Sequence, residues 1–370
     1  MPAHTKHNEI AREIRTEIAS GKYPAEGRLP SEAQLVKRFG VSRPTAAQAL
    51  RTLEREGLVE RRAGSGTYLA PAMLRGSGLR QLGLIVPGLG QIEIFDVICG
   101  ELASLARVQD FGMHWGGTNR PRTESDMTID EAEDLCRQFI GQGVSGVFFA
   151  PFEHTSDNEA ANRRITERLS HAGVPVVLLD RDICPFPQRS AFDLAGIDNF
   201  AGGYLLAEHL IKLGVQRLAF VTRPFSATTM EARKAGVCSA LMRHGLPVPR
   251  DFFHAGDPSD VKFVRRLVAG KTHEAVICTN DHTAARLLQT LTRLNVATPR
   301  DLRVVGFDDV RFATLLPVPL TTIQQPCREI AVTAFHAMRE RLADPTLPAR
   351  SLLVTPRLVV RESCGAYLPR

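Results

Sequence analysis

The sequence predicts two fold classes in one chain: an α+β domain at the N-terminus, then a larger α/β region with parallel sheets. Residues 1–70 carry helix-start signals followed by a short hairpin pattern. In residues 80–370, apolar runs alternate with helical patterns, as in parallel sheets covered on both faces by helices. Residues 71–79 contain Pro, Gly and Ser and offer little to pack, so we expect a linker there.

Three helices are predicted in the N-terminal domain. The opening helix places Ile10, Ile14 and Ile18 on one stripe and ends before Gly21. The other two follow Ser31 and Ser42, and both residues are good N-caps.

Local signals define the second and third helices. Ser31 and Gln34 form a Ser-x-x-Gln capping box, and Gly40 suits a left-handed stop. Pro44 falls in the first turn of the third helix, where a missing N–H costs nothing. Strands at 58–62 and 67–69 then flank a glycine-bearing turn. Two helices around a tight turn, followed by a hairpin, predict a winged helix-turn-helix.

In this fold the second helix of the motif enters the major groove of DNA by its N-terminal end. We expect Arg43 to read a guanine, because a guanidinium reaches O6 and N7 with two parallel hydrogen bonds. Arg61 and Arg62 would bring the wing to the DNA backbone. Lys6 either touches phosphate or belongs to a frayed, solvated end. The candidate DNA contacts are Lys6, Ser31, Arg43, Pro44, Thr45, Gln48, Arg61, Arg62 and Gly64.

The excess of positive over negative charge is confined to the first fifth of the chain. Residues 1–80 hold 14 Lys and Arg against 8 Asp and Glu, whereas the whole chain holds 46 against 40. Residues 81–370 are therefore neutral overall. This distribution favours a phosphate-binding module at the N-terminus.

About 65 residues at the N-terminus resemble the DNA-binding domain of the GntR family of bacterial transcription regulators. The resemblance lies in LPSE, VSRPTAAQAL and LEREGLVERRAGSGTYL. Three positions depart from the family pattern: Ala33 and Ala47 stand where an Arg is usual, and Ala63 stands where a polar residue is common. The resemblance implies operator binding, with Arg43 providing more of the specificity than usual.

The α/β region resembles the effector-binding core of the LacI/GalR repressors, which is similar to type I periplasmic sugar-binding proteins. The matching segments are VPVVLLDRD, GIDNFAGGYLLAEHLIKLG, AVICTNDHTAA, VVGFDDVRFATLLPVPLTTIQQP and LVTPRLVVRES. The resemblance implies two Rossmann-like lobes that clamp a small ligand between them. It also implies three crossing strands, expected near residues 214–217, 322–326 and 354–357.

The resemblance further implies which residues face the ligand. Arg233, Asn280 and Asp308 match ligand-contacting positions, although Arg233 could instead pair with Asp281 or Glu231, and Asp308 could order the hinge. Gln325 would lie on a crossing strand at the cleft floor. The candidate ligand contacts are Glu93, Phe95, Phe152, Arg233, Asn280, Asp308 and Gln325.

Together the two halves are similar to bacterial arabinose repressors. We therefore expect a cytoplasmic, ligand-responsive repressor of carbohydrate-use genes that binds a near-palindromic operator as a homodimer. The alternatives are a nucleoside effector, for which Phe152 and Phe225 would provide stacking surfaces, and a ligand that acts as co-repressor. A doubly wound enzyme fused to a DNA-binding domain is a further alternative.

Catalytic and metal motifs are absent from the sequence. It contains no His-Glu-x-x-His, no paired His/Cys ligand spacing, no Walker loop and no Gly-x-Ser-x-Gly. We accordingly predict no catalytic residues, no metal and no cofactor. Seven scattered Cys favour free thiols in a reducing compartment, and no apolar run reaches the roughly 18 residues of a membrane span.

Overall fold

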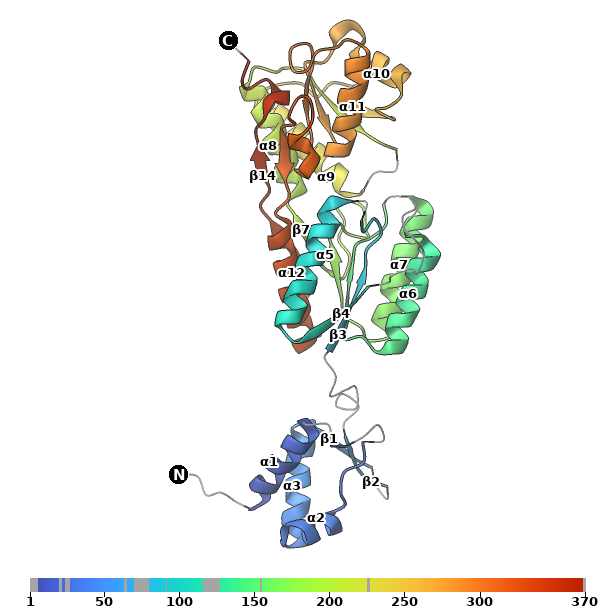
Figure 1. Ribbon diagram of the computed structural model, residues 1–370, viewed down its shortest axis with the longest axis vertical. Helices are drawn as coiled ribbons and strands as arrows, with labels where there is room; N and C mark the ends of the chain where they lie inside the picture. Colours follow the sequence, from blue (N-terminus) through green and yellow to red (C-terminus); the bar gives the residue numbers. More distant parts are fainter. Residues whose placement is uncertain are drawn as a thin grey trace. The chain divides into compact units, whose positions relative to one another are not determined.

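The computed structural model describes residues 6–19, 22–23, 27–62, 65–69, 80–90, 92–115, 127–153, 155–224 and 227–368. The chain divides into two compact units, Met1–Arg80 and Gln81–Arg370 (Figure 1). The expected linker at residues 71–79 lies outside the described residues.

The first unit contains the predicted winged helix-turn-helix. Its helices are α1 (Lys6–Ala19), α2 (Glu32–Phe39) and α3 (Arg43–Arg55). The capping box at the start of α2 is present, and Gly40 ends that helix with φ 61°. Both sequence signals therefore act as predicted.

The wing is the antiparallel pair β1 (Val59–Arg62) and β2 (Gly66–Leu69). The Leu29 N–H donates to the Thr67 carbonyl at 2.8 Å, which ties the segment before α2 to the wing. The buried side chains of all three helices and of both strands meet in one core: Ile10, Ala11, Ile14, Ile18, Leu29, Leu35, Ala46, Ala49, Leu50, Leu53, Val59 and Leu69.

A buried carboxylate joins α1 to α2 inside the first unit. Glu17 is 8% exposed and accepts hydrogen bonds from Arg38 and from the Tyr23 hydroxyl. The Arg38 guanidinium is the main cause that lowers the pKa of Glu17 to about 2. The charged form of Glu17 therefore stabilises the packing of α1 on α2.

Lobe 1 of the second unit is a six-stranded sheet in the order β13-β7-β6-β5-β3-β4. Figure 1 shows α5 and α12 on one face and α6 and α7 on the other. The elements are β3 (Arg80–Ile85), α5 (Glu93–Val108), β4 (Phe111–Trp115), α6 (Ile129–Gln142), β5 (Gly146–Phe149), α7 (Ser156–His171), β6 (Val176–Leu179), β7 (Asp193–Ile197), α12 (Cys327–Ala343) and β13 (Ser351–Val354).

Lobe 2 is a four-stranded parallel sheet in the order β11-β10-β8-β9, between α8 and α9 on one face and α10 and α11 on the other. The elements are α8 (Asn199–Lys212), β8 (Leu218–Thr222), α9 (Thr229–Arg243), β9 (Phe253–Ala255), α10 (Val261–Val268), η1 (Ala269–Lys271), β10 (Ala275–Cys278), α11 (Asp281–Arg293), β11 (Arg303–Val305), η2 (Arg311–Thr314), β12 (Thr322–Gln324), β14 (Arg357–Val359) and η3 (Glu362–Cys364).

The chain passes between the lobes at three places. Two lie where they were predicted. β12 at the second crossing pairs antiparallel with β14 at the third, and β14 directly follows β13 of the lobe 1 sheet. The crossing expected near residues 214–217 was predicted wrongly. It lies at Asp198, because β7 belongs to lobe 1 and α8 already packs on α9 in lobe 2.

Two helices, α10 and α12, were not predicted from the sequence. The phenylalanine, leucine and valine side chains of α10 pack into the core between its helix and the lobe 2 sheet. Helix α12 follows the second crossing and returns the chain to lobe 1, against α5. Among the described residues, no helix is long and apolar enough to cross a membrane.

Candidate DNA-binding surface and ligand-binding cleft

The N-terminal end of α3 lies exposed, as a groove-reading end requires. The Arg43 side chain is 79% exposed, and Pro44 is exposed beside it. The Ser42 and Thr45 hydroxyls lie 2.8 Å apart, while Thr45 and Gln48 are half-buried. This end therefore presents one long cation among short polar groups.

A single carboxylate connects this end of α3 to the wing. Glu32 Oε2 accepts from Arg43 Nε at 3.3 Å, and Glu32 Oε1 accepts from Arg61 Nη2 at 2.6 Å. Arg62 lies over the Tyr68 ring at 4.8 Å. Arg43 and Arg61, predicted independently from the helix and the strand, are thus brought together.

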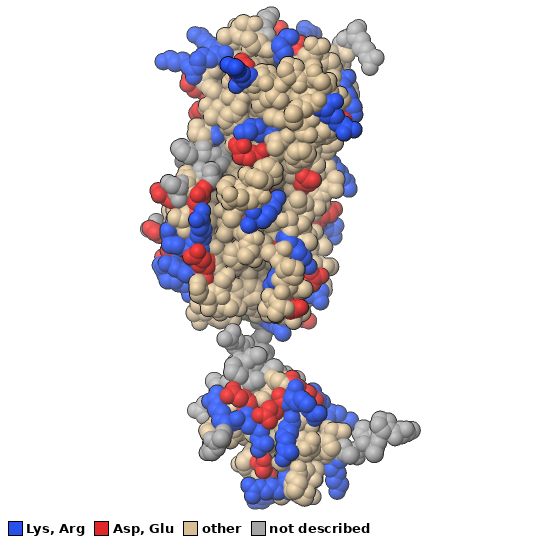
Figure 2. Space-filling model, turned by 180° about the vertical axis from the view of Figure 1, so that it is seen from behind, with Lys and Arg blue, Asp and Glu red and all other residues tan. Residues whose placement is uncertain are grey.

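Ser31 and Lys6, two further DNA candidates, lie at the starts of α2 and α1. The Ser31 hydroxyl accepts from the Gln34 N–H as an N-cap, and Lys6 is the exposed first residue of α1. Gly64 lies outside the described residues. Figure 2 shows Lys and Arg side chains gathered on the visible face of the first unit, with Asp and Glu between them.

In the second unit, Arg233 occupies the centre of a buried polar cluster between the lobes. Its Nε donates to Asn199 Oδ1 at 2.8 Å and its Nη1 donates to the Thr279 carbonyl at 2.6 Å. Its Nη2 lies 3.9 Å from Asp308 Oδ1, and the guanidinium lies 3.6 Å from the Phe307 ring centroid. Arg233 is 6% exposed. It belongs to α9, and its contacts come from the start of α8 and from the residues that follow the strands of lobe 2.

Asp308 and Gln325 belong to the same cluster. Gln325 Nε2 donates to Asp308 Oδ1 at 2.7 Å, which links the end of β11 to the second crossing. Asp308 has φ 111°, a conformation that L-residues rarely adopt, and Asp180 has φ 68°. Strained backbone at a cluster of buried charges is typical of a binding site.

Burial controls the charge state of these carboxyls. Burial raises the pKa of Asp308 to about 6, while the Arg233 guanidinium acts in the opposite direction. Burial also raises the pKa of Asp281 well above its ordinary value, and that carboxyl accepts from the Thr322 hydroxyl and the Val310 N–H. Asp281 therefore ties α11 to β12 and does not pair with Arg233.

Asp180 and Arg181 also belong to the cluster, although neither was predicted as a ligand contact. Both are 5% exposed, and Arg181 Nε donates to Asp180 Oδ2 at 3.2 Å. Among the described residues, Asp180 Oδ1 and Gln325 Oε1 are buried acceptors without a hydrogen-bond partner. The signal was present, because LLDRD places these charges at the end of a buried strand, where α/β sheets bind ligands.

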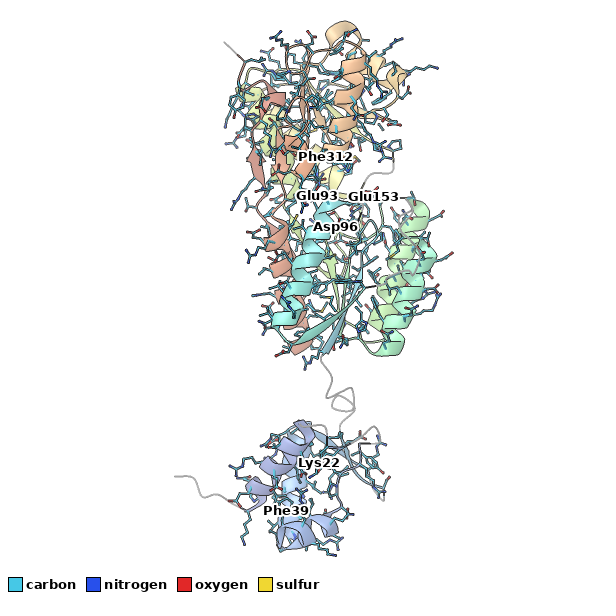
Figure 3. All side chains as sticks on the ribbon, in the orientation of Figure 1. Lys22, Phe39, Glu93, Asp96, Glu153 and Phe312 are labelled. Atoms are coloured by element: carbon cyan, nitrogen blue, oxygen red, sulfur yellow. The ribbon has the colours of Figure 1, made fainter. Side chains whose placement is uncertain are left out.

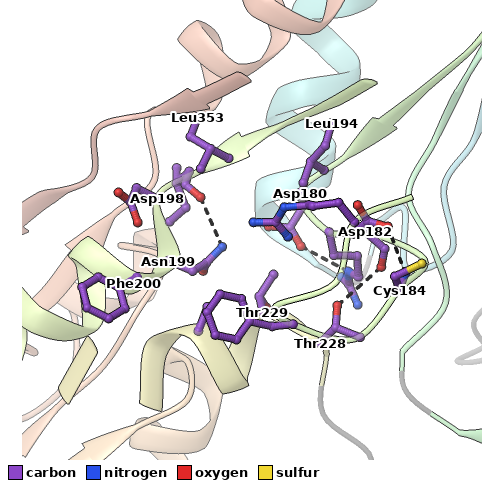
Figure 4. Close-up of a pocket in the computed structure, with 15 residues that line it drawn as sticks. Asp180, Asp182, Cys184, Leu194, Asp198, Asn199, Phe200, Thr228, Thr229 and Leu353 are labelled. Atoms are coloured by element: carbon purple, nitrogen blue, oxygen red, sulfur yellow. Dashed lines mark hydrogen bonds and ion pairs between the residues drawn. The ribbon is translucent and has the colours of Figure 1, made fainter. Parts of the chain in front are cut away.

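Two cavities flank the cluster. The larger, about 300 Å³, is lined by Glu93, Ile94, Asp308, Gln325 and neighbouring residues of α12 and β12. The smaller, about 60 Å³, has Asp180 and Asp182 on one side and Asn199 and Thr229 on the other (Figure 4). Ligand pockets usually measure about 300–1,000 Å³, so the larger cavity suits a small organic ligand and the smaller one suits water.

The other candidates occupy different positions around this cleft. The Glu93 carboxylate accepts from the Arg311 N–H at 3.0 Å, across the cleft between α5 and lobe 2 (Figure 3). Asn280 caps α11 through its Oδ1, which accepts from the Thr283 N–H at 2.8 Å. The Phe95 ring is fully buried in lobe 1, beneath the Arg181 guanidinium at 5.4 Å. Phe152 is half-buried and packs on the lobe 1 core.

Within the part of the chain that the structure describes, no group of three or more His, Cys, Asp or Glu could hold a metal ion. The buried cluster combines carboxylates, guanidinium groups and amides, which are donors and acceptors for an uncharged polar ligand. The architecture is a DNA-binding winged helix joined to a two-lobed ligand-binding domain. This combination defines the class of transcription regulators with a built-in sensor.

Comparison with known domain families agrees with this class. Residues 6–69 match the bacterial regulatory proteins of the gntR family, and residues 207–364 match the periplasmic binding protein-like domain. The chain therefore combines a GntR-type winged helix with a periplasmic binding protein-like domain, the two-part organisation that the sequence motifs predicted. The matched regulatory family and the named relatives are transcription regulators and not enzymes.

Similar proteins include the arabinose metabolism transcriptional repressor of Geobacillus stearothermophilus, which is 25% identical over 97% of each chain. The ribose operon repressor of Escherichia coli K12 is 32% identical over 56% of this chain and 62% of its own length. A ribose-bound LacI family regulator from Enterococcus faecium has a TM-score of 0.61 at 24% identity, over 76% of this chain and 98% of its own.

Proposed function

We propose that this chain is a repressor of carbohydrate-use genes that binds operator DNA and is released by a small sugar. One observation carries the proposal. A buried cluster of two carboxylates and two guanidinium groups adjoins a cavity of about 300 Å³ in a chain that also carries a winged helix, and Asp180 and Gln325 each have an acceptor that no described residue bonds. The names of the arabinose and ribose repressors support the same effector class.

The chemistry of the cluster suits a polyhydroxylated, uncharged ligand. Each sugar hydroxyl is both donor and acceptor, so it can donate to Asp308 or Gln325, which line the larger cavity beside the buried Arg233. The two carboxylates and two guanidinium groups balance one another, so a neutral ligand leaves no buried charge unpaired. A phosphate or carboxylate on the ligand would disturb this balance.

Release from DNA requires that the sugar distinguish two arrangements of the lobes. Contacts already cross the cleft, from the Arg311 N–H to Glu93 and from the Thr228 hydroxyl to the Asp182 carbonyl at 3.5 Å. A ligand that bonds both lobes favours the closed arrangement over the open one. That difference in affinity is the free energy available to change operator binding.

On the DNA side, we propose a homodimer acting in the cytoplasm. Regulators with helix-turn-helix domains bind two half-sites about one helical turn apart, or multiples of it, and a two-fold dimer matches a near-palindromic operator. Arg43 would read a base while Arg61 and Arg62 contact phosphate.

A nucleoside effector remains a second candidate, for which the half-buried Phe152, packed on the lobe 1 core, would have to provide the stacking surface. Phe225, the other aromatic considered from the sequence, lies outside the described residues.

The test is a thermal-shift screen of the full chain against pentoses, hexoses and nucleosides, followed by operator-binding measurements with any stabilising compound. We expect a pentose or hexose to raise the melting temperature and to weaken binding to a DNA duplex selected by the protein from a randomised library. A stabilising nucleoside would replace the sugar in the proposal. If no compound changed either quantity, the effector half of the proposal would fail.

A further inference from the structure

The carboxylate shared by α3 and the wing has a role beyond packing. We propose that Glu32 is a positioning residue for DNA recognition, which holds Arg43 and Arg61 so that both face one duplex. This inference rests on the proposed function, since it specifies how the winged helix would discriminate between DNA sequences.

The hydrogen bonds leave the DNA-facing donors available. Glu32 Oε2 takes only the Nε donor of Arg43, at 3.3 Å, and Oε1 takes only Nη2 of Arg61, at 2.6 Å. Within the described residues, the two Nη groups of Arg43 have no partner. These are donors that can form a parallel pair of bonds with guanine O6 and N7.

Glu32 is better fixed than the arginines it holds. It is the first residue of α2 and lies within the capping box, in which the Ser31 N–H donates to Gln34 Oε1 at 2.8 Å. Its side chain is 22% exposed, against 79% for Arg43. A carboxylate at a helix N-terminus is also favoured by the helix dipole.

Arg43 needs such a support because it is exposed and isolated. Ala33 and Ala47 supply no long polar side chain beside it, and no other carboxylate contacts it among the described residues. An exposed arginine loses side-chain entropy when DNA immobilises it. The ion pair with Glu32 restricts Arg43 before DNA arrives and so lowers that loss.

The same carboxylate repels phosphate, which gives the proposal a distinctive signature. Removing its charge should strengthen general attraction to DNA, because that attraction follows the protein's positive charge. It should at the same time weaken base reading by Arg43. A residue that only stabilised the fold would lower both affinities together.

The experiment measures binding of full-length E32Q to two duplexes of equal length. One duplex is selected from a randomised library by the wild-type protein, and the other is its scrambled sequence. We expect the ratio of the two affinities to fall about tenfold, with scrambled-duplex binding unchanged or tighter. The matched control is E54Q, which removes the same charge from an exposed α3 residue that forms no ion pair with any described residue, and it should leave the ratio unchanged.

A double-mutant cycle with R43A separates positioning from other effects. E32Q should lower the specificity ratio in the wild-type background and leave it unchanged in the R43A background. An unchanged ratio in E32Q, an equal loss in both backgrounds, or a parallel loss on both duplexes with a lower melting temperature would each overturn the role of Glu32. If the wild-type protein enriched no sequence at all, the proposed function itself would be wrong.

Discussion

At the scale of single residues, the cleft depends on Arg233. Its guanidinium contacts Asn199, the Thr279 carbonyl and Asp308, and it lies on the Phe307 ring. The planar fork of an arginine serves these directions at once, whereas the ammonium of a lysine is a single point of charge. The geometry of the cleft therefore depends on the guanidinium and not only on its charge.

We expect R233K to weaken sugar binding by at least tenfold, because hydrogen bonds from charged groups contribute roughly 1.5–3 kcal/mol each. Isothermal titration with the sugar found in the thermal-shift screen measures the change. R286K, an exposed arginine on α11, is the control and should bind as the wild type does. Equal affinities for R233K and R286K would show that Arg233 does not contact the sugar.

Asp308 makes stability depend on pH. Its pKa is about 6 when folded, against 3.8 for an exposed carboxyl, so the folded state holds the proton more tightly. Stability gained from this proton is present at low pH and is lost as pH rises through 6, by on the order of 2–3 kcal/mol. D308N cannot titrate. Urea titrations from about pH 4.5 to 7.5 measure the unfolding free energies of both proteins. We expect D308N to become more stable relative to the wild type as the pH rises. Parallel curves would contradict the prediction.

At the scale of elements, the contact between α8 and α9 sets the position of Arg233. Gly203 and Gly236 allow the two backbones to touch: a Cβ at Gly203 would lie 2.0 Å from the Arg233 carbonyl oxygen, and one at Gly236 would lie 2.0 Å from the Phe200 carbonyl oxygen. Asn199, at the start of α8, bonds Arg233 directly. The close contact between α8 and α9 therefore sets the distance between Asn199 and Arg233.

G203A should move α9 away from α8, destabilise the protein by about 1–3 kcal/mol and reduce the thermal shift that the sugar produces. The matched control is G100A in α5, where an added Cβ meets no atom within 4 Å. That variant should gain about 0.5–1 kcal/mol from higher helix propensity. Melting curves with and without sugar measure both effects, and a stabilised G203A would refute the close-contact argument.

At the scale of the whole molecule, the sensor and the DNA-binding unit are coupled through one chain. Coupling between two binding sites is reciprocal, so the sugar and the operator must change each other's affinity by the same factor. Because the proposed sugar is an inducer, the sugar and the operator should each weaken binding of the other.

We therefore expect the selected duplex to weaken sugar binding by the same factor, about 5–150-fold for typical couplings, by which the sugar weakens binding of that duplex. Sugar titrations with and without saturating duplex measure it, and the scrambled duplex is the control. A sugar affinity that rose in the presence of the selected duplex would identify the ligand as a co-repressor.

The sequence by itself determined the order of the elements and the winged helix. Its signals are local: Ser31 with Gln34, Pro44 after Ser42, and a glycine stop at Gly40 each act within a few residues, so they can be interpreted without the fold. The same holds for the alternation of buried strands and helices. The sequence also identified Arg43, Arg233 and Asp308 as candidate binding residues, because each belongs to a motif.

Only the tertiary structure decided which of these residues meet. Asp180 and Arg181 join Arg233 and Asp308 because the carboxyl ends of strands from two lobes face each other, which depends on where the chain crosses. The ring of Phe95 turns into the lobe 1 core, since burying it among apolar side chains is more favourable than exposing it in a polar cleft. Glu32 meets Arg43 and Arg61 because a helix start, a second helix and a wing converge, a coincidence of three segments that no local pattern contains.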